Sequence, residues 1–249
     1  MKRLVFLALF LLFSASSSFA LTVPERLVYD ISWSGMTAGT AVQEVTQSGD
    51  VLHIVSTTRS ASWLSHFFPV DDRVESVLKK GNSGSGLGMP RFYRERINEG
   101  STHRHKESRF DERELTVTTK DFRDGGKEKV HKITDRTYDT LSCIYFMRKC
   151  DLVVGSSFNI EIYDCKKLWD TEVQVLRKER ITTSLGTFNT IVVKPILRFQ
   201  GMFARTGDVH IWVTDDALRV PVKMTTKVKL GKITATLVGG SYWPEKAQM

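Results

Sequence analysis

Histidines are the residues best suited to hold a metal ion in this 249-residue chain. His103 and His105 are two residues apart, a spacing that places both imidazoles on the same face of a strand. The sequence offers no third ligand, and the intervening Arg104 repels a cation. We therefore interpret the segment as an exposed polar strand and expect neither a metal site nor a cofactor.

Two pairs of adjacent carboxylates could serve in acid–base catalysis or calcium binding. They are Asp71 with Asp72 and Asp215 with Asp216. Aspartate also accepts hydrogen bonds from backbone amides in turns, and we expect that role. The sequence contains no nucleophile elbow, phosphate-binding glycine loop or zinc-hydrolase helix, and the glycine-rich residues 81–88 predict a hairpin loop. We assign no catalytic residue.

Large apolar side chains gather in the segment 63–70, which reads WLSHFFPV. Such a cluster is costly if exposed, and exposed clusters of this kind mark binding surfaces. Two interpretations stay open: a binding rim for a ligand or partner, or a plug that closes one end of a sheet. The candidate binding residues are Trp63, Leu64, Phe67 and Phe68, with Phe199, Met202 and Phe203 as a second group for the same wall or another patch.

Residues 1–20 have the features of a cleavable secretory signal peptide. Lys2 and Arg3 provide a basic start, residues 4–13 are continuously apolar, and small residues precede Ala20. A run of about ten apolar residues is shorter than the roughly 20 of a transmembrane helix, so we expect cleavage after Ala20 rather than anchoring. We predict a periplasmic or otherwise exported protein without a transmembrane segment after cleavage.

The mature chain, residues 21–249, is expected to form a single β-domain, and its apolar content suits a sizeable core. Loss of Lys2 and Arg3 would lower the formal charge from +8 to about +6. A modest basic excess suits anionic lipid headgroups, glycans or nucleic acid, although a well-solvated surface explains it equally well. Export argues against nucleic acid as a partner.

Export also favours disulfide formation among Cys143, Cys150 and Cys165. Cys143 and Cys150 lie seven residues apart in a segment predicted to be helical, so their Cα atoms are roughly 10 Å apart. That distance exceeds the roughly 7 Å reach of a disulfide. We predict a disulfide between Cys150 and Cys165, with Cys143 as a buried thiol. A zinc site would need a paired CxxC or histidine doublet, which the sequence lacks.

Short segments rich in Val, Ile, Thr, Tyr and Phe alternate with Gly, Asn and Asp along the chain, which is typical of strands joined by tight turns. Leu141, Ile144, Tyr145 and Arg148 break this pattern with helical spacing. We predict a mainly β fold: a strongly curved antiparallel sheet, a half-barrel or β-roll, with one central α-helix around residues 137–149. The predicted strands cover 27–33, 39–46, 51–58, 73–79, 91–98, 102–111, 114–121, 127–133, 157–163, 168–183, 188–199, 208–214, 221–230 and 232–238.

The segment 91–113 is rich in Arg, Glu and His and poor in aliphatic residues. We expect it to form long exposed strands at an edge of the sheet, where charge discourages unwanted pairing.

Four segments together resemble the DUF3108 family of exported bacterial proteins of unknown function. They are ERLVYDISWSGMTAG at 25–39, YDTLSCIYFMR at 138–148, LGTF at 185–188 and IWVTDDALRVPV at 211–222. Cys143 departs from the small apolar residue expected at its position. The resemblance implies export and a β-rich fold, and it transfers no catalytic residue, cofactor or substrate to this chain.

Three functions follow as hypotheses. The first is a non-enzymatic envelope protein that binds an apolar or amphipathic ligand, such as a lipid, or an envelope protein on the concave side or rim of the sheet. The second is an envelope glycan or peptidoglycan hydrolase, which would need two carboxylates at roughly 5 to 9.5 Å in a cleft. The third is a structural or assembly factor that pairs through its edge strands.

Overall fold

The computed structural model describes residues 21–80, 87–196, 208–228 and 231–243. The predicted signal peptide and most of the predicted loop 81–88 therefore lie outside the described residues. No helix within the described part is long and apolar enough to cross a membrane. The strands are β1 (Glu25–Trp33), β2 (Met36–Ser48), β3 (Val51–Ser60), β4 (Asp71–Lys79), β5 (Pro90–Glu99), β6 (Thr102–Asp111), β7 (Thr116–Asp121), β8 (Lys127–Lys132), β9 (Thr137–Asp139), β10 (Ser157–Tyr163), β11 (Leu168–Thr183), β12 (Gly186–Pro195), β13 (Val209–Thr214), β14 (Pro221–Val228) and β15 (Gly231–Gly240), and the helices are α1 (Ser62–Ser65) and α2 (Ser142–Lys149).

All the strands belong to one sheet, in the order β8-β7-β6-β5-β4-β3-β2-β1-β15-β14-β13-β12-β11-β10-β9. Each half is a meander, because neighbours in sequence are also neighbours in the sheet. The first and last strands, β1 and β15, pair at the centre. Every pairing is antiparallel except that of β9 with β10. The prediction of a mainly β, antiparallel fold is confirmed, and the sheet is open, with β8 and β9 at its edges.

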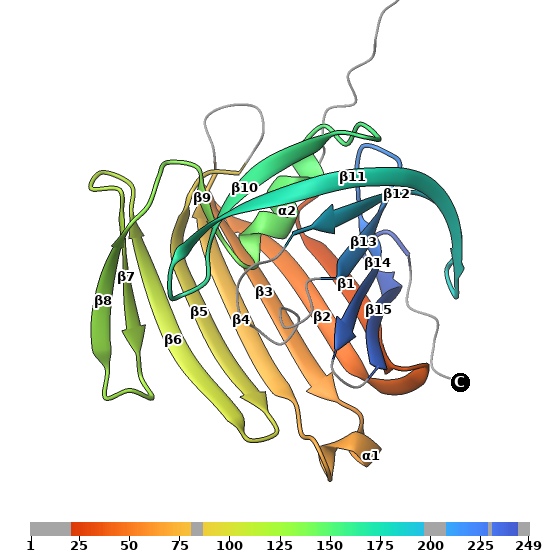
Figure 1. The fold of residues 1–249 in the computed structure, drawn as a ribbon, viewed down its shortest axis with the longest axis horizontal. Coiled ribbons are helices and arrows are strands. Elements are labelled where there is room, and N and C mark those ends of the chain that lie inside the picture. The colour runs from red at the N-terminus through yellow and green to blue at the C-terminus, as the bar shows by residue number, and fades with distance from the viewer. Residues whose placement is uncertain (1–20, 81–86, 197–207, 229–230, 244–249) are drawn as a thin grey trace, which may run out of the picture.

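The halves of the sheet, β1–β8 and β9–β15, pack against each other through a shared apolar core. In Figure 1, β10 and β11 pass across the strands β2 to β5, with α2 beside them. Inward-facing side chains from both halves and from the helix form one cluster, which excludes water from the space between them. Its members include Val45, Ile54, Leu78, Tyr93 and Val117 from the first half, Tyr145 and Met147 from α2, and Ile160, Val173, Ile191 and Val193 from the second half.

Polar contacts join the two halves as well. Buried hydroxyl and carboxyl groups need partners, because an unpaired buried polar group costs about 1–3 kcal/mol. Here each partner comes from the opposite half of the sheet. The pairs are Ser76 Oγ with Asp139 Oδ2 at 2.5 Å, Tyr93 Oη with Thr140 Oγ1 at 2.8 Å, Thr119 Oγ1 with Tyr163 Oη at 2.9 Å, and His131 Nδ1 with Tyr163 Oη at 3.0 Å.

The central helix is shorter than predicted. Residues 137–139 form the edge strand β9, and α2 runs from Ser142 to Lys149. Asp139 Oδ1 accepts hydrogen bonds from the backbone N–H groups of Leu141 and Ser142 at 2.9 and 2.8 Å. The carboxyl group thus satisfies amides that the helix itself leaves unpaired.

A buried ion pair fastens α2 to the first strand. Arg148 Nη1 donates to Glu25 Oε2 at 2.8 Å, and both side chains are almost fully buried. The same guanidinium donates to the carbonyl of Leu218 through Nε at 3.2 Å and Nη2 at 2.9 Å. The Tyr145 ring lies 5.1 Å from its central carbon. We call Glu25, Arg148, Tyr145 and Leu218 the Arg148 cluster. It ties together β1, α2 and the segment between β13 and β14.

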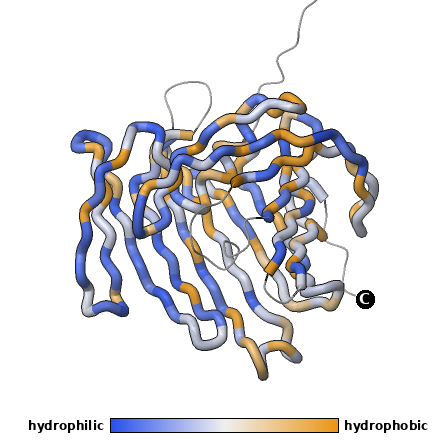
Figure 2. The backbone as a smooth tube through the Cα atoms, viewed as in Figure 1, coloured by the Kyte–Doolittle hydropathy of each residue, from blue (hydrophilic) through white to orange (hydrophobic). Residues whose placement is uncertain are grey.

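The prediction that the segment 91–113 lies at an edge of the sheet is wrong. The strands β5 and β6 are internal, with β4 on one side and β7 on the other. Figure 2 shows this half of the sheet as mostly hydrophilic. Cross-strand ion pairs satisfy its charges, since Arg94 contacts Glu75 at 3.4 Å and Glu107 at 2.9 Å. Charge here therefore marks a polar face rather than an edge.

Candidate functional site

The loop between β3 and β4, residues 61–70, carries the most exposed aromatic side chains of the described chain. We call it the rim loop. It begins with the single-turn helix α1, and it projects from one end of the sheet in Figure 1. Phe67 is 84% exposed, Trp63 44% and Phe68 46%, whereas Leu64 is half-buried. The sequence-predicted residues Trp63, Leu64, Phe67 and Phe68 therefore share one short loop.

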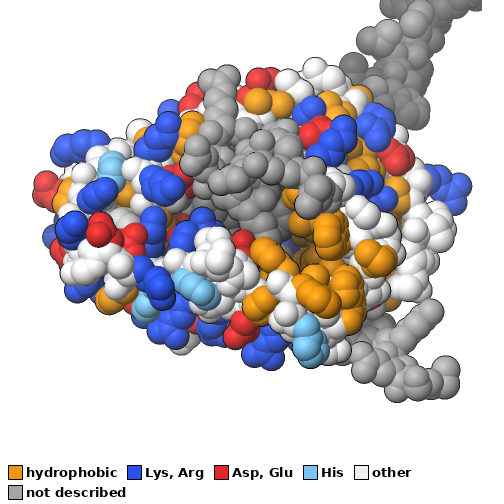
Figure 3. All heavy atoms as spheres, turned by 60° about the horizontal axis from the view of Figure 1, so that its bottom comes forward, with side chains coloured by type: hydrophobic (Ala, Val, Ile, Leu, Met, Phe, Trp, Pro, Cys, Tyr) orange, Lys and Arg blue, Asp and Glu red, His pale blue; other side chains and the backbone are white. Residues whose placement is uncertain are grey.

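The apolar surface extends beyond the rim loop to the turn between β1 and β2. Met36 is 55% exposed, and the neighbouring Thr37 carbonyl accepts a hydrogen bond from Trp63 Nε1 at 2.8 Å. Figure 3 shows hydrophobic side chains gathered on this end of the molecule, while charged side chains dominate the rest of the same view. We call Met36, Trp63, Leu64, Phe67 and Phe68 the rim patch. Met36 was missed because a lone methionine in a turn gives no sequence signal.

Backbone hydrogen bonds hold the rim loop on the sheet. Ala61 N–H donates to the Ala38 carbonyl at 2.8 Å, and Gly100 N–H donates to the Pro69 carbonyl at 2.8 Å. Val70 forms an antiparallel bridge with Glu99. Because both ends of the loop are fixed, the exposure of its aromatic residues is a property of the folded protein.

Phe67 and Phe68 differ in what they contact. The Phe68 ring lies over Gly100, where an added Cβ would come within 2.7 Å of Phe68 Cε2. Gly100 also has a φ of +55°, which glycine adopts at no steric cost. Phe68 thus anchors the loop on the β5–β6 turn. Phe67 projects into solvent and is the side chain best placed to meet a partner.

The second predicted group, Phe199, Met202 and Phe203, lies outside the described residues. The structure therefore leaves open whether these side chains extend the rim patch. Their assignment as binding residues stays a prediction.

A pair of carboxyl groups lies beneath the rim loop. Asp72 and Glu99 share a hydrogen bond, and burial raises the pKa of both, that of Glu99 to about 8. Asp72 Oδ1 also accepts the backbone N–H of Asn98 at 2.8 Å. Arg104 lowers both pKa values and so partly opposes the effect of burial. The pair therefore keeps a proton near neutral pH.

The predicted aspartate pairs do not act as units. Asp71 is exposed and contacts Arg59 at 3.3 Å, whereas Asp72 points to the buried face, because adjacent strand residues face opposite sides. Asp216 Oδ1 accepts the backbone N–H groups of Leu218 and Arg219 at 3.0 Å each. This is the turn role that the sequence predicts. Asp215 instead contacts Lys178 at 2.7 Å.

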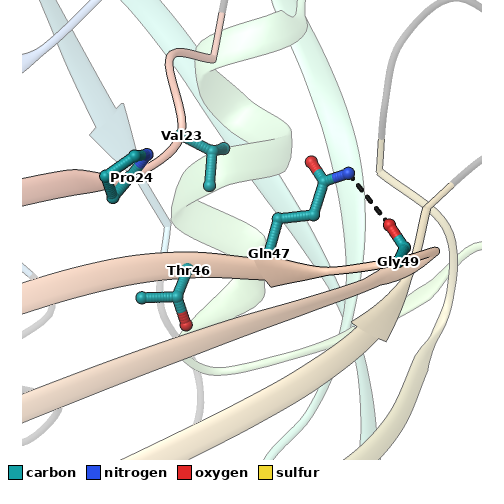
Figure 4. Close-up of a pocket in the computed structure, with 5 residues that line it drawn as sticks. All are labelled: Val23, Pro24, Thr46, Gln47 and Gly49. Atoms are coloured by element: carbon teal, nitrogen blue, oxygen red, sulfur yellow. Dashed lines mark hydrogen bonds between the residues drawn. The ribbon is translucent and has the colours of Figure 1, made fainter.

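The hollows among the described residues give little support for catalysis. One, of about 580 Å³, lies between Val23 and Pro24 on one side and Thr46, Gln47 and Gly49 on the other (Figure 4). It is open and has no charged side chain in its wall. A second, of about 560 Å³, is lined by Lys79, Met89, Pro90, Arg91, Phe110, Asp111, Glu112 and Arg113.

The second hollow does contain carboxylates, but Asp111 is a turn residue. Its Oδ1 accepts the backbone N–H groups of Arg113 and Glu114 at 2.9 and 3.0 Å. These bonds hold the pKa of Asp111 below its usual value. A carboxylate held ionised by amides is poorly suited to donate a proton, so Asp111 is not suited to be the acid that a hydrolase needs.

The predicted disulfide is wrong, since Cys143, Cys150 and Cys165 are all free. Strand β10 runs between Cys150 and Cys165 and carries the chain roughly 23 Å, at ~3.3 Å per residue. Cys165 is buried with its Sγ 3.4 Å from Ser108 Oγ on β6. Cys150 Sγ instead faces the Phe146 carbonyl of its own helix. Burial raises the pKa of Cys150 to about 11, which makes it a poor nucleophile.

Of the histidine pair, His103 is exposed and His105 is half-buried. His103 Nδ1 lies 3.1 Å from Asn98 Oδ1, and the His105 ring stacks on Phe122 with centroids 4.5 Å apart. Within the described part of the chain, no group of three histidine, cysteine or acidic residues is arranged to hold a metal ion.

Comparison with protein families decides the classification. The model for DUF3108, a protein family of unknown function, matches residues 28–238, which is most of the chain. The chain belongs to the DUF3108 family. This confirms the resemblance carried by the four sequence segments. Among curated proteins, no match was found for this DUF3108 chain.

A solved structure shares the fold. It is the β-barrel-like protein of the domain of unknown function DUF1849 from Brucella abortus, with a TM-score of 0.53 and 10% sequence identity. The similarity covers 88% of this DUF3108 chain and 97% of the Brucella chain. At this identity it supports the architecture alone.

Proposed function

We propose that this DUF3108 protein is an exported, non-enzymatic component of the cell envelope that binds an amphipathic lipid through the rim patch. One observation carries the proposal: Phe67 is 84% exposed on a loop that is fixed at both ends. Soluble surfaces seldom keep such apolar groups in water unless they meet a partner. Export rests on the predicted signal peptide, residues 1–20.

The shared core between the two halves of the sheet supports a ligand site at the rim. We interpret the fold as a half-barrel whose concave side is filled by the shared core and α2 rather than by a ligand, because that core includes side chains from both halves. A ligand would therefore bind at the rim. The charged side chains of the first half would keep the rest of the surface soluble.

Binding to vesicles of phosphatidylcholine tests the proposal, because these vesicles offer apolar contact without net charge. We expect the mature protein to co-float with them and Phe67→Ser to weaken binding roughly tenfold or more, since burying a phenylalanine contributes about 2 kcal/mol. Val153→Ser is the matched control, because Val153 is 64% exposed but lies between α2 and β10. Equal binding by wild type and Phe67→Ser would contradict the proposal.

An envelope protein as the partner is a distinguishable outcome. A photoreactive phenylalanine analogue at position 67 should yield a lipid adduct in the host envelope, and the same analogue at position 153 should not. A protein adduct specific to position 67 would overturn the lipid assignment and keep the rim patch as the binding surface.

A further inference from the structure

We propose that the lipid surface met by the rim patch carries anionic headgroups, which Arg73 and Arg96 contact from the outer face of the sheet. The inference rests on the proposed function, because it names the charge of the partner of the same patch. It comes from the strand register beside the rim loop. That register brings two guanidinium groups together on an exposed face.

Arg73 on β4 lies directly opposite Arg96 on β5. Directly opposed residues share a face of the sheet, with Cβ atoms roughly 5 Å apart. Arg96 in turn lies opposite His105 on β6. Arg59 and His103 lie on the same face, one row nearer the rim, because Arg59 pairs with Asp71 and His103 with Asn98. Asp71 on this face contacts Arg59 at 3.3 Å, so Arg73 and Arg96 are the basic groups of the outer face next to the rim loop that Asp71 leaves uncompensated.

The opposition of two arginines is unfavourable in the protein by itself, since like charges across a strand pair repel. Arg73 is partly compensated by Glu75, whose Oε1 lies 2.6 Å from its Nε. For Arg96 the described residues provide neither a hydrogen bond nor an ion pair, and its side chain is exposed. An anionic group placed between the two arginines would remove the repulsion and give Arg96 a partner.

The spacing between the arginines and the aromatic residues suits a bilayer surface. Arg96 precedes Gly100, which Phe68 covers, by four residues, or roughly 13 Å of strand. Aromatic side chains of peripheral proteins reach about 5–10 Å into the boundary between headgroups and acyl chains. Charges within a Debye length of about 8 Å from the surface are still attracted to anionic lipids. Phe67 would then enter the apolar boundary while Arg96 stays at headgroup level.

The exposed chemistry of the rim patch favours a bilayer over an acidic protein segment. The indole N–H of Trp63 is already bonded to the Thr37 carbonyl, so the exposed part of the ring is carbon. Aromatic rings beside basic residues are the combination found where proteins meet membranes.

The test measures co-flotation of the mature protein with two kinds of vesicle. One kind contains phosphatidylcholine alone, and the other contains phosphatidylcholine and phosphatidylglycerol at 3:1. We expect the anionic vesicles to bind the mature protein more tightly, and Arg96→Gln to weaken that binding about fivefold. Arg96→Gln should leave binding to phosphatidylcholine unchanged. Arg109→Gln is the matched control, because Arg109 is exposed on the same face but lies farther from the rim. Added salt should reduce the preference for anionic vesicles.

The outcomes separate the two proposals. If anionic lipid brings no gain while Phe67→Ser still weakens binding, the inference about headgroups is wrong and the proposed function stands. If Arg96→Gln prefers anionic vesicles over phosphatidylcholine vesicles as strongly as the wild type does, the assignment of this arginine is wrong. If Arg96→Gln weakens binding to a polyglutamate peptide but not to anionic vesicles, the partner is an acidic protein segment.

Discussion

Two regions of the molecule handle buried charge in opposite ways. The Arg148 cluster joins opposite charges, and its guanidinium is further satisfied by the Leu218 carbonyl. The rim instead places two carboxyl groups, Asp72 and Glu99, in contact beneath a loop of exposed aromatic residues. The first arrangement fixes β1, α2 and the segment between β13 and β14 to each other. The second leaves a site whose stability depends on a proton and whose surface is open to a partner.

The largest effect should follow from breaking the opposite-charge pair. Arg148→Met would leave Glu25 buried without its cation and the Leu218 carbonyl without its donors. We expect a loss of about 3–5 kcal/mol in the free energy of unfolding, measured by urea denaturation. The double variant Glu25→Gln with Arg148→Met should recover part of that loss. A single variant as stable as wild type would show that the Arg148 cluster contributes little.

The Asp72–Glu99 pair should make the protein less stable as the pH rises. Because burial raises the pKa of Glu99 to about 8, the folded protein keeps a proton that the unfolded chain releases above about pH 4.5. This contribution is fully present below pH 4.5 and is lost as the pH rises through about 8. We expect the free energy of unfolding to fall by about 1–3 kcal/mol between pH 5 and 9, measured by urea denaturation across that range.

Glu99→Gln should make the free energy of unfolding depend less steeply on pH, because the glutamine amide does not ionise in this range. Asp71→Asn is the control, since Asp71 is adjacent to the pair in sequence but exposed, and it should leave the slope intact. The groups around the pair are Arg104, Asp71 and Glu95. A slope of the same size in Glu99→Gln would assign the dependence to another group.

A smaller effect should come from the contact between Phe68 and Gly100. Gly100→Ala introduces a Cβ at a φ of +55° and against the Phe68 ring. We expect a loss of about 1–2 kcal/mol in the free energy of unfolding, together with faster proteolysis within the rim loop. Gly125→Ala is the control, because Gly125 also has a positive φ but an added Cβ there would meet no atom within 4 Å. The comparison separates the effect of backbone strain from that of displacing the Phe68 ring. Equal rates of loop cleavage in the two variants would show that the ring contact does not hold the loop.

Local patterns in the sequence predicted much of the fold. Segments rich in Val, Ile, Thr, Tyr and Phe, separated by turn residues, predicted the strands, and helical spacing around Tyr145 predicted α2. The resemblance to DUF3108 was also correct. Asp139 and Asp216 do in the structure what short-range turn chemistry predicts.

What could not be predicted depends on register and on the path of the chain. The Asp72–Glu99 and Arg73–Arg96 contacts join strands whose pairing a single sequence does not specify, so neither pair was found. The disulfide prediction failed because β10 carries the chain from the end of α2 towards β6, where Cys165 contacts Ser108. The edge assignment failed because cross-strand ion pairs let charged strands lie inside a sheet.

Flotation of Phe67→Ser is the sharpest test of lipid binding through the rim patch, because this substitution changes an exposed side chain and should alter the free energy of unfolding by less than about 0.5 kcal/mol. We expect Phe67→Ser to be as stable as wild type in urea denaturation and to have lost most of its binding to phosphatidylcholine vesicles, while Val153→Ser binds normally. Undiminished binding by a folded Phe67→Ser protein would contradict the assignment of the rim patch as the lipid-binding site.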